Sequence, residues 1–153
     1  MLPTNRLSPK NQVTLPGDAR TFGGGDLPKQ LHGLPHGMTS DRGETFPVLV
    51  IMSDSELRRR EQKILDDARL TGEQKLNLVT RLNGGLATMA VDAQHRVVLP
   101  PHVVAHLKVD RDVFLVATNT TIQVWNPDHY RRWAGLDGET PAVNPALSEY
   151  LAI

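Results

Sequence analysis

One short phrase occurs twice in the chain. Residues 8–16 have the sequence SPKNQVTLP, and residues 91–100 have the sequence VDAQHRVVLP. In each copy a polar turn that carries a basic residue is followed by a short apolar stretch closed by Leu-Pro. This pattern predicts a hairpin whose second strand ends at the proline, because proline has no backbone N–H to donate to a neighbouring strand. A chain that repeats a hairpin in this way has to fold around two copies of one unit.

The two halves of the chain match beyond the hairpins. Each half has a strand, a polar turn, a second strand, Leu-Pro, a short helix, an apolar strand and a capped helix. A unit this small has too few strands to bury a core alone, so the two copies are expected to interlock. The predicted fold class is mainly β with helices (α+β), as one duplicated β-barrel domain with pseudo-two-fold symmetry.

The region between the two hairpins is predicted to contain a loop, a buried strand and two helices. Residues 21–44 are rich in glycine and proline breaks and predict a long surface loop. Residues 46–52, FPVLVIM, form an almost continuous apolar run, which predicts a central strand buried on both faces. Capping boxes that begin at Ser53 and Thr71 predict two linker helices within residues 53–82.

The remaining elements complete the predicted organisation. Leu78, Val79 and Leu82 on the second linker helix are expected to face the core, and Asn126 is expected to cap a last helix. The predicted units are a first repeat with its inserted loop and linker helices (1–82), a second repeat (83–135) and a flexible C-terminal tail (136–153).

Composition excludes several classes of function. Seventeen Lys plus Arg balance seventeen Asp plus Glu, so no global field draws the protein to nucleic acid or to anionic lipid, and any such attraction must be local. The absence of cysteine removes disulfides and thiolate sites and suits a reducing cytosol. No apolar run approaches ~18 residues, so we expect a cytoplasmic protein without a membrane partner.

Several of these segments resemble the MraZ family of transcriptional regulators. Asp92-x-x-x-Arg96 followed by VVLPP resembles the signature of that family, and the linker segment LDDARLTGEQKLNLVTRLNGGLATMAVD and the closing IQVWNPDHYRRW follow its pattern over roughly residues 5 to 135. The resemblance implies two SpoVT/AbrB-type (swapped-hairpin) modules in one chain. It also implies DNA binding by ring-like homo-oligomers on repeated promoter boxes, in association with the nucleoid.

The first copy departs from the family signature. Ser8 stands where the signature has aspartate, and Gln12 stands where it has arginine. The run from Lys10 to Pro16, together with Arg20, instead resembles AbrB-like regulators and MazE-type antitoxins. Because both of these relatives bind DNA, the departure bears on the subfamily more than on the class of function.

The chemistry of the turns fits contact with double-stranded DNA. Lys or Arg projecting from a rigid barrel can contact phosphate oxygens, and Gln, Asn or Arg can hydrogen-bond to base edges in the major groove. Asn also tolerates a left-handed turn. The alternative for Arg96 is an ion pair with Asp92 that only stiffens the hairpin. The candidate DNA-binding residues are Arg6, Lys10, Asn11, Gln12 and Arg20 in the first copy, and Gln94, His95 and Arg96 in the second.

Other patterns give no support for a metal site, a cofactor or catalysis. His102 and His106 have a spacing able to hold a metal, but no third ligand is evident nearby, so capping or surface roles are favoured. The residues Gly23–Gly25 lack the following Lys-Ser or Lys-Thr of a phosphate loop. No Ser-His-Asp arrangement or pair of acids stands out, and we expect a protein that is not an enzyme.

The sequence therefore favours a sequence-specific DNA-binding transcriptional regulator of MraZ type. One alternative is an antitoxin-like autoregulator that holds a toxin with its tail. Another is a structural or interaction barrel that has lost DNA binding, an idea motivated by Ser8 and Gln12.

Overall fold

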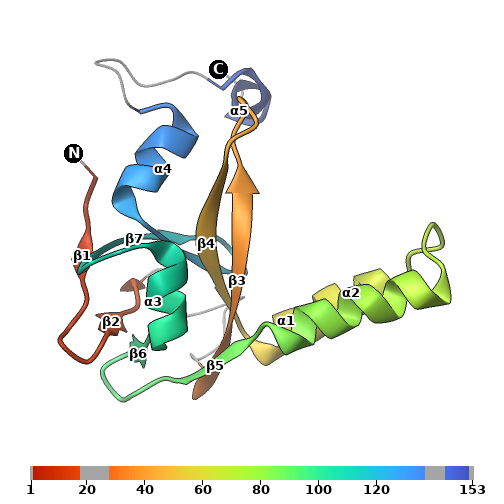
Figure 1. Cartoon of the computed structure of the whole chain (residues 1–153), viewed down its shortest axis with the longest axis horizontal. Coiled ribbons are helices and arrows are strands. Elements are labelled where there is room, and N and C mark those ends of the chain that lie inside the picture. The colour runs from red at the N-terminus through yellow and green to blue at the C-terminus, as the bar shows by residue number, and fades with distance from the viewer. Residues whose placement is uncertain (1, 18–27, 137–143, 152–153) are drawn as a thin grey trace.

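The protein is built on an antiparallel sheet whose strands come from both halves of the chain. The computed structural model describes residues 2–17, 28–136 and 144–151. A six-stranded sheet has the order β1-β7-β8-β4-β3-β5, and β2 and β6 form a separate two-stranded ribbon (Figure 1). The predicted fold class, mainly β with helices in a barrel-like arrangement, is confirmed. The strands are β1 (Asn5–Arg6), β2 (Gln12–Thr14), β3 (Gln30–Thr39), β4 (Thr45–Met52), β5 (Ala87–Ala90), β6 (Arg96–Val98), β7 (Asp112–Ala117) and β8 (Ile122–Trp125).

Each half of the chain completes the sheet of the other half. Strand β1 pairs with β7 of the second half, with Asn5 opposite Val113, and β5 pairs with β3 of the first half, with Gln30 opposite Ala90. The ribbon joins the two repeated phrases directly, with Val13 opposite Val97 at its centre. This interlocking follows from the repeat, because neither set of strands encloses a core without the other.

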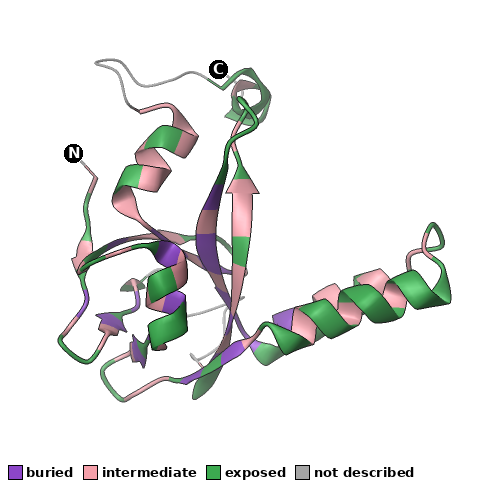
Figure 2. Cartoon of the chain, viewed as in Figure 1, coloured by how far each residue is buried: buried purple, intermediate pink, exposed green. Residues whose placement is uncertain are grey.

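The central strand β4 appears where it was predicted. It lies between β8 and β3, and Val48, Leu49 and Ile51 are fully buried. A buried cluster that includes Leu15, Leu99 and residues of the sheet forms the main core, and Figure 2 shows that the buried positions gather in this body of the molecule. The apolar run of β4 is thus explained by its central position, because strands pair with both of its edges and other parts of the protein cover both of its faces.

The prediction of a surface loop over residues 21–44 is wrong for its second part. Residues Gln30–Thr39 form β3, a ten-residue strand between β4 and β5. Its Gly33 is a packing position rather than a break, because a Cβ there would lie 3.0 Å from Leu49 Cδ1. Glycine in a strand often marks such a close approach, and tertiary packing here overrides weak strand propensity. Residues 18–27 of the predicted loop lie outside the described residues.

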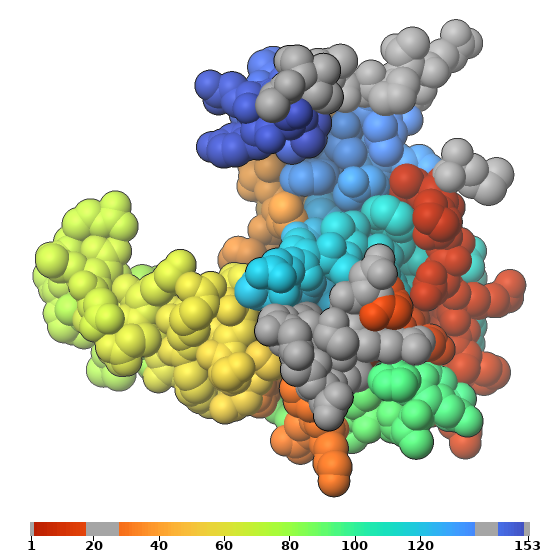
Figure 3. All heavy atoms as spheres, turned by 180° about the vertical axis from the view of Figure 1, so that it is seen from behind, coloured from red at the N-terminus to blue at the C-terminus, as the bar shows by residue number. Residues whose placement is uncertain are grey.

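The two linker helices form an antiparallel arm, residues 54–84, that projects from the sheet. Figures 1 and 3 show it extending away from the body of the molecule. Thr71 forms the complete predicted capping box with Gln74, whereas at Ser53 the hydroxyl accepts from the Glu56 backbone N–H at 3.2 Å and the Glu56 side chain does not complete the box. The helices of the chain are α1 (Asp54–Leu65), α2 (Gly72–Gly84), α3 (Pro101–Leu107), α4 (Pro127–Ala134) and α5 (Pro145–Leu151).

The expectation that the second linker helix faces the core is wrong. No residue of α2 is buried, and Leu78 is 41% exposed. Helix α2 contacts α1 rather than the sheet, as shown by the Arg58 Nη1 hydrogen bond to Asn83 Oδ1 at 3.2 Å. An apolar stripe on a helix indicates only that it needs a partner, and here that partner is a single helix.

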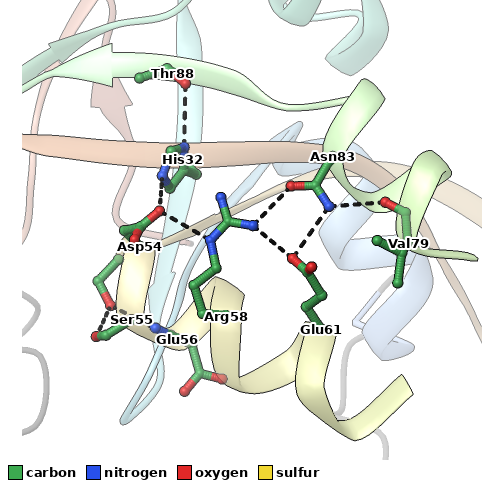
Figure 4. Close-up of polar contacts among 10 residues, drawn as sticks. His32, Asp54, Ser55, Glu56, Arg58, Glu61, Val79, Asn83 and Thr88 are labelled. Atoms are coloured by element: carbon green, nitrogen blue, oxygen red, sulfur yellow. Dashed lines mark hydrogen bonds and ion pairs between the residues drawn. The ribbon is translucent and has the colours of Figure 1, made fainter. Parts of the chain in front are cut away.

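A polar cluster fixes the base of the arm to the sheet. His32 Nε2 on β3 donates to Asp54 Oδ1 at 3.0 Å, and its Nδ1 lies 3.3 Å from the Thr88 hydroxyl on β5 (Figure 4). Asp54 also pairs with Arg58 on the next turn of α1. Because this cluster joins two strands to the first turn of α1, it sets the direction in which the arm leaves the sheet.

The arginines at positions 58–60 of α1 form ion pairs with acids of the same helix. Two hydrogen bonds from Arg59 and one from Arg60 lower the pKa of the Glu56 carboxyl to about 2. The Glu56 side chain therefore binds these arginines instead of completing the cap at Ser53. This arrangement accounts for the run of arginines as a helix face with internal ion pairs.

The last helices cover the other end of the sheet. Asn126 caps α4 as predicted, accepting from the backbone N–H of Asp128 at 2.9 Å. Trp125 is fully buried against Trp133, with ring centroids 5.1 Å apart. Within the predicted C-terminal tail, residues 145–151 form α5. Among the described helices, none combines the length and the apolar character needed to cross a membrane.

Candidate nucleic-acid interface

The two turns that precede the repeated strands have the same backbone conformation. In the first turn (residues 8–12) the backbone N–H of Asn11 donates to the Ser8 carbonyl, and in the second (residues 92–96) that of His95 donates to the Asp92 carbonyl. Asn11 and His95 both have a left-handed backbone, with φ of 60° and 61°. The left-handed position predicted for Asn11 is confirmed, and His95 occupies the equivalent place.

The first residue of each turn fixes it through its side chain. The Ser8 hydroxyl accepts from the backbone N–H groups of Lys10 and Gln12, at 3.2 and 3.0 Å. The Asp92 Oδ1 accepts from the corresponding N–H groups of Gln94 and Arg96, both at 2.9 Å. Serine and aspartate both make such local bonds, so replacing the aspartate leaves the turn intact.

The turns are also joined to each other across the β2–β6 ribbon. The Leu15 N–H donates to the His95 carbonyl at 2.8 Å, and the Leu99 N–H donates to the Asn11 carbonyl at 2.9 Å. The first turn therefore lies at one end of the ribbon and the second turn at the other, both on the side of the molecule away from α5 (Figure 1). Alternation buries the two central valines of the ribbon. It leaves Gln12, Thr14, Arg96 and Val98 on the opposite side, called here the outer ribbon face.

The side chains of the second turn are held by an ion pair. Arg96 Nε donates to Asp92 Oδ2 at 2.8 Å. The pKa of the Asp92 carboxyl is lowered, chiefly by the backbone N–H of Arg96 and further by its guanidinium. The stiffening role considered for Arg96 is therefore present in the structure. The Arg96 side chain nevertheless remains 39% exposed.

The first turn has no such ion pair among its own residues, and a residue distant in the sequence holds it instead. Arg111, at the start of β7, donates through Nη1 to the Ser8 carbonyl at 2.9 Å. Its own carbonyl accepts from the Leu7 N–H at 2.7 Å. A tertiary contact thus takes the place of the local pair that Ser8 and Gln12 cannot make.

Most of the candidate residues come together at this end of the molecule. Arg6 and Lys10 are exposed, and Arg6, Gln12 and Arg96 line one shallow hollow with Ser8. Gln94 is exposed at the second tip, whereas Asn11 and His95 are half-buried and shape the turns. Arg20 lies outside the described residues.

Two basic residues beside the turns were not among the sequence candidates. Lys29 precedes β3 and accepts from the Val91 N–H through its carbonyl at 2.9 Å, as Arg111 does from Leu7 in the other half. The two residues are therefore equivalent under the pseudo-two-fold relation. Recognising β3 as a strand would have placed Lys29 beside the second turn.

The neighbouring polar hollow carries a mixed charge. Between the N-terminal segment and the start of α4, the hollow is lined by basic residues that include Arg6 and Lys108, and by acids that include Asp110 and Asp128. Asp128 also pairs with Arg131 in the same hollow, at 2.8 Å. The positive charge therefore does not extend evenly across this side of the molecule.

The histidine pair considered as a metal site has a structural use. The Nε2 of His106 lies 3.0 Å from the His36 carbonyl and 3.1 Å from the Val48 carbonyl, so this nitrogen carries a proton and donates to the sheet. Within the described ranges, no three His, Asp or Glu side chains gather in a way that would hold a metal ion.

Comparison with known proteins gives one distant similarity. No family model matches the chain. The chain is similar to the protein named transcriptional regulator MraZ from Caldanaerobacter subterraneus subsp. tengcongensis. The two are 23% identical over 108 residues, which covers 66% of this chain and 75% of that protein. This level of identity supports a distant relationship to the MraZ transcriptional regulators.

Proposed function

We propose that this chain is a sequence-specific DNA-binding transcriptional regulator of MraZ type. It acts without catalysis or cofactor, and binds repeated promoter boxes as a homo-oligomer. The observation that supports the proposal best is the pair of matching turns, joined across one ribbon, with Lys10, Gln94 and Arg96 exposed or half-exposed at one end of the molecule. The distant similarity to a MraZ regulator is consistent with this role.

The β2–β6 ribbon is one of the kinds of element that can enter the major groove of DNA. The major groove admits a two-stranded β-ribbon, whose outward side chains then meet base edges. The flanking cations Arg6, Lys29 and Arg111 lie beside the turns, where phosphate oxygens would run on either side of such a groove. In this proposal the outer ribbon face contacts bases, and the flanking cations position it.

Repetition would supply the affinity. Phosphate contacts lose strength as salt rises, and with about four of them a fourfold rise in salt lowers the affinity on the order of 100-fold. A single neutral protomer with so few contacts therefore binds weakly at physiological salt. An oligomer that places several copies along repeated boxes gains avidity without new contacts. A cytoplasmic location in association with the nucleoid follows from the same proposal.

Fluorescence anisotropy with the upstream DNA of the gene tests the proposal at two salt concentrations. We expect binding that weakens as salt rises and is lost in the Lys10→Ala, Arg96→Ala double variant. A Lys63→Ala, Arg81→Ala variant removes the same charge from the exposed surface of the arm and should bind like the wild type. Absence of binding at low salt would favour a structural barrel instead, and light scattering that shows a monomer would count against the oligomer.

An antitoxin-like role is the second candidate, because α5 exposes apolar side chains. Leu147 is 56% exposed and Tyr150 is 85% exposed, so this helix offers an uncovered apolar surface. Deletion of residues 144–153 separates the two candidates. The regulator should keep its DNA affinity after this deletion, whereas an antitoxin should lose its protein partner.

A further inference from the structure

We propose that Gln12 makes the DNA site of a single chain non-palindromic, by recognising an A·T pair where its counterpart Arg96 recognises a G·C pair. This inference rests on the proposed function, because it assigns bases to the outer ribbon face defined above. It concerns one position of the repeat, which is Gln12 in the first copy and Arg96 in the second, and at which the two side chains have different chemistry.

Gln12 and Arg96 are equivalent in the backbone. Each is the last residue of its turn, and each backbone N–H is held by the side chain of the first residue, Ser8 or Asp92. The Val13–Val97 pair lies at the centre of the ribbon, so the pseudo-two-fold relation exchanges the residues that precede these valines. A protein with identical residues at the two positions would present a symmetric surface, and this chain does not.

The two side chains offer different hydrogen-bonding groups. With Nε of Arg96 engaged by Asp92, its two Nη nitrogens donate no hydrogen bond within the described part of the chain, and neither does the Gln12 amide. A guanidinium presents paired donors, which match the O6 and N7 acceptors of guanine. A glutamine amide presents a donor and an acceptor, which match N7 and the amino group of adenine.

The ribbon also sets the spacing between the two contacts. Gln12 lies opposite Val98, two residues along β6 from Arg96, so Gln12 and Arg96 are diagonal neighbours on one face. Diagonal neighbours are about 7–8 Å apart in an antiparallel pair. Successive bases rise about 3.4 Å along a strand, and the two base pairs should therefore lie about two steps apart.

Selection of bound duplexes from a randomised DNA library tests the inference. The wild type should enrich a box with a preferred A·T pair and a preferred G·C pair about two steps apart. In Gln12→Arg, the A·T preference should change to G·C at the same position, while the preference at the other position stays. In Gln12→Ala, the discrimination at that position should fall by about 5- to 150-fold, the range expected for one bidentate contact.

The outcomes separate this inference from the proposed function. If Gln12→Arg enriches the same sequences as the wild type, Gln12 does not set the base preference and the inference is wrong, although DNA binding stands. If the wild type enriches nothing, the proposed function fails and the inference fails with it. The Lys63→Ala variant, on the arm, should keep both preferences, and thermal melting of each variant verifies that the ribbon is folded.

Discussion

The two turns of this chain share one backbone and carry different side chains. In the second turn, Asp92 holds both the backbone and Arg96, whereas in the first turn Ser8 holds only the backbone and Arg111 supplies an outside contact. The conformation of the turn thus depends on a side-chain acceptor at its first position and on a left-handed residue at its fourth. The Asp92–Arg96 ion pair orients the Arg96 side chain. Its loss changes the side chains that the turn exposes, but not the backbone conformation of the turn.

The equivalence of the two halves is tested most strongly in the core. Leu15 and Leu99 follow the ribbon strands in the two halves and are 1% and 0% exposed. Leu15→Ala and Leu99→Ala should each lower the free energy of unfolding by about 2–5 kcal/mol, because each leaves a cavity in the shared core. Urea denaturation measures both. A large loss for one variant and a negligible loss for the other would mean that the halves do not share the core equally.

The outside contact of the first turn predicts a difference between equivalent cations. Arg111→Ala should lower the free energy of unfolding by about 1.5 kcal/mol, because it removes a charged donor from the Ser8 carbonyl. Lys29→Ala is the matched control, since its backbone role is kept and no hydrogen bond from its ammonium lies within the described residues. Thermal or urea unfolding distinguishes them. Equal stability of the two variants would show that the Arg111 contact does not stabilise the first turn.

The left-handed residues should respond alike in the two turns. Asn11→Ala and His95→Ala place a side chain with no local hydrogen bonding at φ of 60° and 61°, and each should cost about 1 kcal/mol of stability. Asn11→Gly and His95→Gly serve as controls, since glycine adopts this conformation readily. If either alanine variant were as stable as its glycine counterpart, the turn at that site would have to adopt another backbone.

Low pH should weaken the second turn but not the first, and the resulting loss of stability should be smaller than the effects above. The pKa of Asp92 is depressed in the folded state, mainly by the Arg96 backbone N–H. Asp92 therefore stabilises the fold above its unfolded value of about 3.9, and this stabilisation is lost as the pH falls through the folded pKa. Asp92→Ser copies the first turn, whose serine does not titrate. Urea midpoints between about pH 5 and pH 2 should fall more for the wild type than for Asp92→Ser. Glu56 titrates in the same window in both proteins, so it cancels.

Local patterns in the sequence identified the elements that local forces determine. The box at Thr71, the cap at Asn126 and the left-handed Asn11 are each set by neighbours in the chain, and the apolar run of β4 is visible as a continuous local pattern. Strand β3 was missed because Gly33 and Gly37 resemble loop residues, and close packing against Leu49, Met89 and Thr45 on the neighbouring strands explains them.

The rest depends on contacts between distant segments. The pairing of β1 with β7, and the positions of Lys29 and Arg111 beside the turns, follow from the interlocked halves and from no local pattern. The exposure of Leu78 was missed for a related reason, since its helix pairs with a neighbour and leaves the sheet. The candidate site was therefore found where it lies on the repeated phrase, and missed where each half of the chain completes the turn of the other half.

The exchange of strands between the halves also affects how the chain is made. Asn5 pairs with Val113, so β1 is synthesised long before the strand that becomes its partner. Until then the apolar side of the amino-terminal hairpin stays uncovered. This order of synthesis predicts an interval in which β1 depends on rapid completion of the downstream strands, or on a chaperone, to avoid pairing with the same segment of another nascent chain.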